Sequence, residues 1–337
     1  MEAKLSRNRT LDIMKGIGII LVVLYHAMGA SDKSMLEVYH NGLYNMIASF
    51  FMLMFFVVSG YLVYGKIGEW GWTWRHIVKW LPAIFIFGIV YWAWSYYVLN
   101  RLHFPYGEPL SVYAEYVLMT GFAGVILWYL WAMLLCYLVT YLIEKARISA
   151  NNKLVGLIII GVIIVINLFP FDGLGIVNLK WYGIFFFIGY AIRHYKGWLG
   201  KFNKLSYACL ILFPLVGWLL GWLQPFETEL AHLGLAFPVL TIINGDYALL
   251  GVTFLMALLG TGFVYSLAKI KVRYLSNALA YIGASSIGIY LLHILFVSLS
   301  SNYLISFVIA LVLGLGLYEI LKRIKITNKL LFGGFHG

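Results

Sequence analysis

Three ionisable residues interrupt the first long apolar stretch of the sequence, "LDIMKGIGIILVVLYHA". They are Asp12, Lys15 and His26, and most of their neighbours are isoleucine, leucine and valine. On a helix with about 3.6 residues per turn, Lys15 and His26 share one face, roughly 16 Å apart along the axis, and Asp12 lies on that face too. Histidine is the side chain best matched to proton transfer near neutral pH, so the stripe predicts chemistry at His26 with Lys15 and Asp12 in support.

Each of these residues also has a purely structural interpretation. Asp12 can cap the start of the helix, and Lys15 can extend its amine to the inner membrane surface. His26 lies within about one turn of the outer end, where water at the interface can solvate it. The residue types alone leave both interpretations open.

A second polar stripe lies near the C-terminus, in "SSIGIYLLHILF" (285–296). Ser286, Tyr290 and His293 are spaced i, i+4 and i+7, so on a helix they share one face that is expected to point into a helix bundle. The alternative for His293 is a hydrogen-bonded contact between helices. Neither His26 nor His293 has partners at the spacing of metal ligands, so no metal site is expected.

A cationic cluster follows the second apolar stretch, in "GEWGWTWRHIVKWLP" (68–82). Arg75, His76 and Lys79 lie between tryptophans, and guanidinium and ammonium groups pair strongly with phosphates. The cluster therefore predicts a phosphate-binding site for a cofactor. Ordinary basic residues on the inner side of a membrane, with an aromatic belt, are the alternative.

The composition indicates what must position these residues. Of the 337 residues, 63% are hydrophobic and 11% are charged, and the mean hydropathy is +0.89. Apolar runs of about 18 residues or more recur along the chain, each long enough to cross a bilayer as a helix. We expect a single all-α integral membrane domain over 1–337, with about ten transmembrane helices in one bundle. The predicted spans are 11–30, 42–64, 77–99, 124–143, 154–169, 179–193, 205–223, 247–268, 280–299 and 303–321.

The net charge of +11 is explained by a membrane topology. With the N-terminus inside, most Lys and Arg residues fall in the segments that alternate to the cytoplasmic side, as the positive-inside rule requires. Both termini are then expected in the cytoplasm, and a nucleic-acid partner is not expected. Cys136 and Cys209 lie within predicted spans, which argues against a disulfide framework.

The ordered motifs resemble the acyltransferase 3 family, membrane O-acyltransferases that modify surface glycans. Lys15, ten intervening residues and His26 resemble the first-helix signature of that family. The segment "FFMLMFFVVSGYLV" (50–63) resembles its second helix, which ends in Ser-Gly-aromatic, here Ser59, Gly60 and Tyr61. The stretches "RHIVKWLP" and "SSIGIYLLHILF" resemble its inner-loop and late-helix motifs. The opening is most similar to the fucose 4-O-acetylase-like branch.

The resemblance implies O-acetylation: transfer of an acyl group, most often acetyl, from cytoplasmic acyl-CoA to a sugar hydroxyl. The acceptor would be a cell-surface or lipid-linked glycan or an exported exopolysaccharide, and the protein would lie in the cytoplasmic membrane of a bacterium. His26 would act as general base or become acylated itself, and Lys15 would guide the donor or stabilise developing charge. Asp12 would hold Lys15 as an ion-pair partner.

The chain departs from the family pattern at the cationic motif. His76 stands where a second Arg is usual, Lys79 where a third is usual, and Lys15 replaces the commoner Arg. Fewer guanidinium groups reduce bidentate pairing with phosphate. Two other classes remain open: a polysaccharide or lipid transporter with the same polar stripes along its path, and a non-catalytic membrane assembly partner. The sequence sets neither the acceptor sugar nor the oligomeric state.

Overall fold

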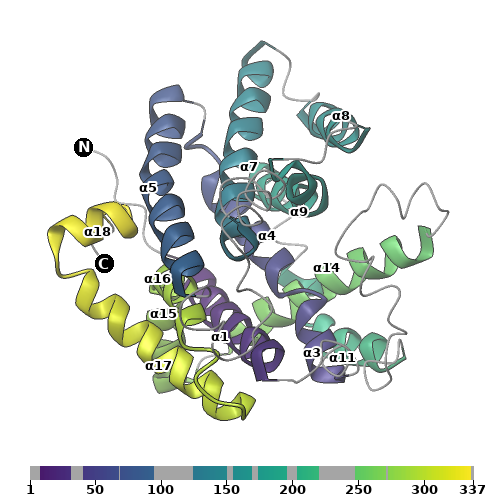
Figure 1. Ribbon diagram of the computed structural model, residues 1–337. Helices are drawn as coiled ribbons and strands as arrows, with labels where there is room; N and C mark the ends of the chain where they lie inside the picture. Colours follow the sequence, from purple (N-terminus) through teal and green to yellow (C-terminus); the bar gives the residue numbers. More distant parts are fainter. Residues whose placement is uncertain are drawn as a thin grey trace.

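The computed structural model describes most of the chain. The described residues form helices and turns without any β-strand, so the all-α prediction is confirmed (Figure 1). The described residues are 8–31, 41–67, 69–94, 124–149, 155–168, 174–195, 203–219, 247–270 and 272–334. The main helices are α1 (Arg9–Ser31), α3 (Gly42–Ala48), α4 (Phe51–Val63), α5 (Trp70–Trp94), α7 (Gly124–Ser149), α8 (Val155–Leu168), α9 (Ile176–His194), α11 (Cys209–Leu219), α14 (Tyr247–Lys269), α15 (Arg273–Ala284), α16 (Ser286–Leu292), the short 3-10 turn η4 (His293–Leu295), α17 (Tyr303–Leu321) and α18 (Lys325–Leu331).

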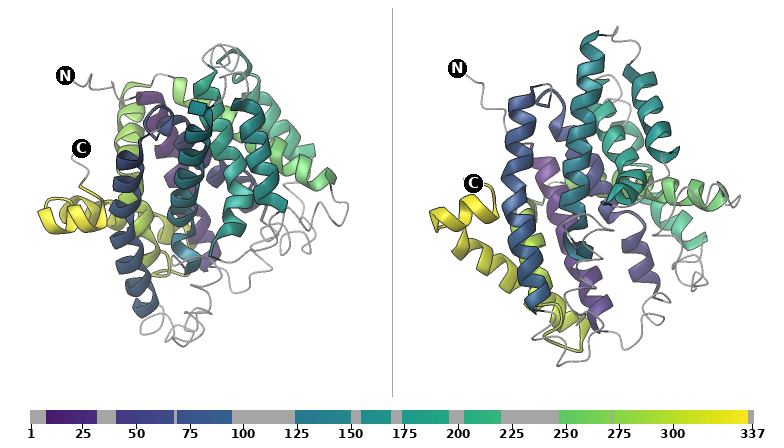
Figure 2. Two further views of the ribbon diagram at one scale, coloured as in Figure 1. Left: turned by 90° about the horizontal axis from the view of Figure 1, so that it is seen from above. Right: turned by 45° about the horizontal axis from the view of Figure 1, so that its top comes forward.

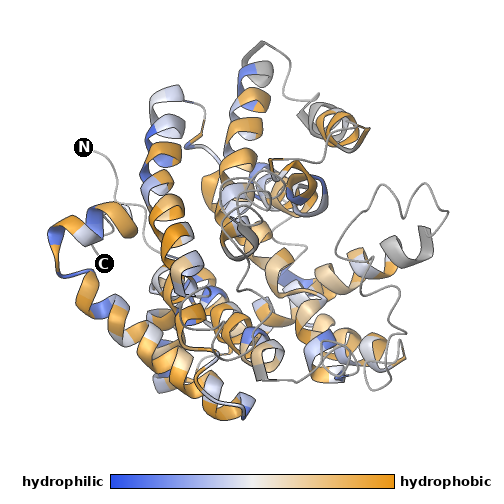
Figure 3. Ribbon diagram, in the orientation of Figure 1, coloured by the Kyte–Doolittle hydropathy of each residue, from blue (hydrophilic) through white to orange (hydrophobic). Residues whose placement is uncertain are grey.

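Six helical segments of the described chain are long and apolar enough to cross a membrane. The pair α15–α16 with η4 passes the same criterion but bends by 61° at its break. The ribbon coloured by hydropathy in Figure 3 shows mostly apolar residues along the helices. The six are 9–30, 42–63, 70–94, 127–145, 251–269 and 303–321.

Each of the ten predicted ranges overlaps a helix or a helix pair, which confirms a multi-pass bundle. Helices α8 and α11 are too short to meet the length criterion, with 14 and 11 residues, and α9 is not among the six. The exact count of ten, and the placement of both termini in the cytoplasm, therefore stay predictions.

Local sequence sets where two of these helices begin. The Asn41 side chain accepts hydrogen bonds from the backbone of Leu43 and Tyr44 at the start of α3. The Asn302 side chain does the same for the second and third residues of α17. An asparagine in this position satisfies amide groups that the first helical turn leaves without partners.

Helices α1 and α15 form the first of two close parallel pairs. A Cβ on Gly16 would lie 2.0 Å from the Leu279 carbonyl oxygen, and one on Gly283 would lie 1.7 Å from that of Asp12. Only glycine permits backbones to approach this closely, as at other small-residue contacts between membrane helices. Two side-chain contacts, Arg9–Asn277 and His26–His293, follow in the same order along α1 and along the chain from α15 to η4. The two therefore run in the same direction.

Helices α4 and α9 form the second close pair. A Cβ added to Gly60 or to Gly189 would lie 1.9 Å from a carbonyl oxygen of the facing helix and would overlap it. At the ends of the two helices, the Tyr64 hydroxyl lies 3.0 Å from Nδ1 of His194. Helix α7 packs against α9 and against α5, so it joins this pair to the rest of the bundle (Figure 1).

The C-terminal helices cover one side of the bundle. Helix α17 packs along α1 and α16, and α18 turns back to pack on α5 (Figure 2). Phe332, just after α18, is fully buried, and the Tyr91 hydroxyl of α5 donates to the Leu291 carbonyl of α16. These contacts hold α5, α16 and α17 around the space described next.

Candidate active site

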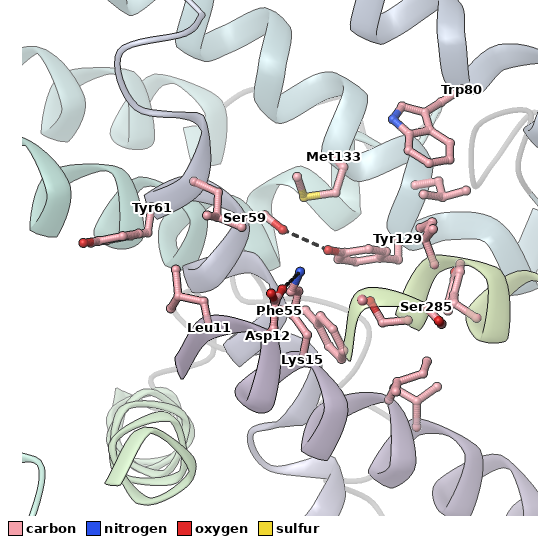
Figure 4. A pocket seen from close by; sticks show the side chains of 18 of the residues that line it. Leu11, Asp12, Lys15, Phe55, Ser59, Tyr61, Trp80, Tyr129, Met133 and Ser285 are labelled. Carbon is pink, nitrogen blue, oxygen red and sulfur yellow. Dashed lines mark hydrogen bonds and ion pairs between the residues drawn. The ribbon is translucent and has the colours of Figure 1, made fainter. Parts of the chain in front are cut away.

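A cavity of about 1130 Å³ lies between the two close helix pairs. Helices α1, α4, α7 and α15–α16 supply most of its wall, and α5, α9 and α17 supply single side chains that complete it. Figure 4 shows these side chains converging from the surrounding helices on one space. The lining residues used below are Asn8, Asp12, Lys15, Val22, Ser59, Tyr61, Lys66, Trp80, Tyr129, Arg193, Ser286, Tyr290 and Lys322.

Asp12 and Lys15, two of the three residues of the predicted stripe of α1, face this cavity. The Lys15 ammonium lies 2.7 Å from the Asp12 carboxylate, and both residues line the cavity near the start of α1 (Figure 4). Asp12 is only 6% exposed, so its charge is stabilised by partners and not by bulk water. The ion pair that the spacing predicted is therefore present, while its role in catalysis stays a prediction.

Further cations surround the end of the cavity near the start of α1. Lys66, Arg193 and Lys322 line it, together with the amide of Asn8. Arg193 Nη1 donates to the Tyr61 hydroxyl at 2.8 Å. Lys322 pairs with Glu319 of α17 at 2.5 Å. Counting Lys15, four cations and one carboxylate line the cavity, which favours an anionic ligand at this end.

The middle of the cavity has an aromatic wall. The hydroxyls of Ser59 and Tyr129 lie 3.1 Å apart and share a hydrogen bond (Figure 4). The rings of Tyr129 and Tyr290 meet edge to face, with centroids 5.7 Å apart. Ser59, Ser286 and Tyr290, three of the predicted polar positions, therefore line one cavity. An apolar wall with few hydroxyls suits a long flexible ligand held by its ends.

The two histidines predicted from separate stretches meet beyond the far end of the cavity. Nδ1 of His26 lies 2.8 Å from Nε2 of His293, with the ring centroids 5.0 Å apart and the ring planes inclined by 25°. Val22 and Tyr290 line the cavity one turn before each histidine. His293 is 1% exposed, whereas His26 keeps part of its surface accessible although it does not line the cavity. His26 thus lies just beyond the cavity lining and is partly accessible.

The predicted cationic cluster lies elsewhere. Arg75 is exposed, and none of Arg75, His76 and Lys79 lines the cavity. Nδ1 of His76 donates to the Trp72 carbonyl at 2.9 Å, and its ring stacks on Trp72. Only Trp80 of α5 reaches the cavity wall. The assignment of the cluster to cofactor phosphates stays a prediction.

Sequence reasoning did not single out Arg193, Lys322 or Tyr129. Arg193 and Lys322 were visible only as ordinary inner-side charges, and Tyr129 as one tyrosine in an aromatic helix. Parallel packing of α4 and α9 brings Arg193 to Tyr61 and so to the cavity. Contacts of this kind depend on tertiary structure, which the spacing within one helix does not reveal.

The arrangement combines a cation-lined end, an aromatic wall and an imidazole pair beyond the other end. A histidine next to a hydrogen-bond partner is suited to general base or nucleophilic catalysis. A ligand with a polyanionic head and a reactive tail would place the tail near His26. The separation of the cationic end from the imidazole pair fits transfer of a group from such a donor.

Comparison with known families supports a group-transfer function. A family model described as an acyltransferase domain matches residues 8–318. A comparison with curated proteins finds no match, and a comparison with solved structures finds none either. The family match does not distinguish branches, so the fucose 4-O-acetylase-like branch stays a prediction. Because the match covers nearly the whole chain, including both histidine helices, the chain belongs to the acyltransferase 3 family of membrane acyltransferases.

Proposed function

We propose that this membrane acyltransferase moves an acetyl group from cytoplasmic acetyl-CoA to a sugar hydroxyl of a surface or exported polysaccharide. The observation that carries the proposal is the continuous cavity along α1. It begins among cations at the start of the helix and ends one turn before His26. This layout suits a donor whose phosphates stay at the cytoplasmic side while its thioester reaches into the membrane.

The cations at the open end supply the donor site. Lys66, Arg193 and Lys322 are placed to pair with the phosphates of the coenzyme. Their predicted position is the cytoplasmic side, where acyl-CoA is found. The pantetheine arm then lies along the aromatic wall. Arg75, His76 and Lys79, outside this lining, are the alternative phosphate site, and the two sites are distinguished experimentally below.

Lys15 is assigned to the donor arm and not to the reacting carbonyl. Lys15 and His26 are eleven positions apart on the helix, about 16 Å along the axis. Hydrogen bonds that stabilise a developing oxyanion act over about 3 Å, so Lys15 is too far from His26 for that role. Its pairing with Asp12 keeps the amine directed into the cavity, where it meets the polar atoms of the arm.

His26 is assigned as the general base. Its ring takes the proton from the sugar hydroxyl, whose oxygen forms a bond to the thioester carbonyl carbon. The carbon–sulfur bond then breaks, and the coenzyme leaves as a thiol after taking the proton from His26. The part of His26 that is exposed outside the cavity gives the acceptor its approach. Transient acylation of His26 is the competing route.

The test uses inside-out vesicles that contain the protein and glycan lipids. Acetyl-CoA labelled in the acetyl group is supplied, and base-labile label is followed in the glycan fraction. Wild type is compared with His26→Ala and with Thr261→Val, which removes a buried hydrogen bond to Ala257 away from the cavity. We expect label with wild type and Thr261→Val and none with His26→Ala at equal protein level.

Other outcomes separate the remaining hypotheses. Label with His26→Ala would keep the acetyltransfer but remove His26 from the chemistry. If neither acetyl-CoA nor succinyl-CoA gave labelled glycan in wild type, the acyltransfer proposal would fail. Movement of unmodified glycan lipid across the vesicle membrane would then support the transporter hypothesis.

A further inference from the structure

We propose that His293 is a positioning residue that fixes the protonation of the His26 ring. It holds His26 with a proton on Nδ1 and a lone pair on Nε2, the atom that accepts the hydroxyl proton. The role of Nε2 as acceptor of the hydroxyl proton rests on the proposed function. The protonation of the two rings rests only on their surroundings.

The backbone sets the protonation of His293. Nδ1 of His293 lies 3.0 Å from the Ile289 carbonyl oxygen and 2.8 Å from the Tyr290 carbonyl oxygen. A carbonyl oxygen can only accept a hydrogen bond, so Nδ1 must carry the proton. In a neutral imidazole, Nε2 is then the acceptor.

A neutral ring is the form that this environment favours. His293 is 1% exposed and lies among Ile289, Leu291, Leu292 and Gly314. A charge buried in such surroundings is costly unless an opposite charge lies beside it. The polar contacts of the ring among the described residues are two carbonyl oxygens and Nδ1 of His26, and no carboxylate is seen among them.

The protonation of His26 follows from that of His293. Nε2 of His293 is an acceptor that lies 2.8 Å from Nδ1 of His26, so Nδ1 of His26 must donate. Nε2 of His26 is left with the lone pair. The backbone of α16 thus determines, through His293, which nitrogen of His26 is basic, as second-shell partners do for metal-bound histidines.

The pair also stabilises His26 when the proton moves. When Nε2 of His26 takes the hydroxyl proton, the ring becomes an imidazolium and its Nδ1–H bond to His293 becomes charge-assisted and stronger. The interaction is therefore greater in the transition state than before the reaction, which lowers the barrier to the chemical step. Loss of His293 should lower kcat and leave the KM for the donor unchanged.

Two variants at position 293 separate positioning from packing. His293→Gln keeps an amide oxygen that can accept from His26 Nδ1, whereas His293→Leu keeps a comparable volume without an acceptor. We expect His293→Leu to lower kcat roughly 10- to 100-fold, and His293→Gln to recover most of that loss. Thr261→Val serves as the control for loss of a buried hydrogen bond. Equal kcat for the Leu and Gln variants, or wild-type kcat for the Leu variant, would overturn the positioning role.

A spectroscopic measurement tests the ring states without activity. Nitrogen-15 and carbon-13 NMR of ring-labelled histidine in nanodiscs reports which nitrogen is protonated, and the His26 signals are assigned by their loss in His26→Ala. We expect a protonated Nδ1 and a free Nε2 in wild type, and a mixture of tautomers in His293→Leu. A protonated Nε2 in wild type would overturn the inference. If no donor gives labelled glycan, the proposed function fails while the NMR result still decides the ring states.

Discussion

A single histidine in an apolar helix has two ring nitrogens, and each must find a partner or remain near water. His26 and His293 meet this requirement together, because one ring nitrogen of each faces the other. The second nitrogen of His293 faces the backbone, and His26 retains an accessible surface. A pair of this kind leaves one nitrogen of His26 for chemistry while every buried nitrogen has a contact.

The ion pair between Asp12 and Lys15 gives the first prediction. Asp12→Asn and Lys15→Met each remove one charge of the ion pair at 2.7 Å, so each should destabilise the protein and reduce acetyltransfer. The double variant should be less unstable than the sum of the two, with a coupling free energy of roughly 0.5–3 kcal/mol. Denaturant-induced unfolding in detergent measures the free energy of unfolding of the wild type, the two single variants and the double variant. Additive effects would show that the pair contributes nothing through its contact.

The residue scale also shows which contacts a sequence can predict. Asp12 and Lys15 lie three residues apart on one helix, so helical geometry alone predicts their contact, and the structure confirms it. His293 was predicted to face the bundle and His26 to take part in chemistry, but 267 residues separate them. Their meeting depends on how α1 and α16 pack, and no periodicity within one helix contains that information.

At the scale of elements, two glycine-mediated contacts set the register of the site. Gly16 and Gly283 let α1 and α15 run parallel in close contact, and this register places His26 next to His293. Gly60 and Gly189 do the same for α4 and α9, and bring Arg193 to Tyr61. Close backbone approach is a principal source of helix association in a bilayer, where burial of apolar surface gives little driving force.

The second prediction concerns this contact. In Gly16→Ala the added methyl would overlap the Leu279 carbonyl at 2.0 Å, so α1 and α15 must separate. Overpacking of this kind costs about 1–3 kcal/mol, and the shifted register should also lower kcat. Gly29→Ala is the matched control on the same helix, because the nearest atoms lie 4.0 Å away. Thermal stability and acetyltransfer are measured for both, and equal behaviour would contradict the role of Gly16.

Some features of the elements were predicted from sequence and others were not. Apolar runs identify helices because a bilayer permits few other structures. The range 280–299 was predicted as one span, and the structure breaks it at Ser285 and bends it by 61°. Ser285 and Ser286 line the cavity at this bend, and His293 begins a 3-10 turn. Hydropathy does not register such breaks, because the residues on both sides remain apolar.

At the scale of the whole molecule, basic residues gather at one end of the cavity, and this predicts how the donor binds. Arg193→Gln should raise the KM for acetyl-CoA by about 3- to 10-fold, as expected for a phosphate contact partly screened by water. Arg323→Gln is the matched control, because Arg323 is exposed and does not line the cavity. Wild-type KM should also rise with ionic strength more steeply than that of Arg193→Gln.

The same measurement on Arg75→Gln distinguishes the two phosphate sites. Arg75 belongs to the cluster predicted from sequence, and it lies outside the cavity lining. If Arg75→Gln raises the KM more than Arg193→Gln does, the phosphates bind near the start of α5. The assignment of the donor to the cavity entrance would then be wrong.

The orientation of the molecule gives the last prediction. The positive-inside rule places the start of α1, and with it Lys66 and Lys322, in the cytoplasm. The chain after His293 then lies at the other end, because the chain from α15 to His293 runs in the same direction as α1 and α17 returns from that end to Lys322. The cysteine of Glu69→Cys should therefore face the cytoplasm, and the cysteine of Ser301→Cys should face outward.

Both positions are exposed, so a membrane-impermeant thiol reagent can reach each from its own side. We expect Glu69→Cys to react in inside-out vesicles and Ser301→Cys in intact cells, at protein levels that match wild type. The native Cys136 and Cys209 are buried, and the wild-type chain measures their background. Reaction of both new cysteines from one side would contradict the shared direction of α1 and the α15–α16 segment across the membrane. Reaction of each from the opposite side would invert the topology and place the basic entrance outside, where it could not receive a cytoplasmic donor.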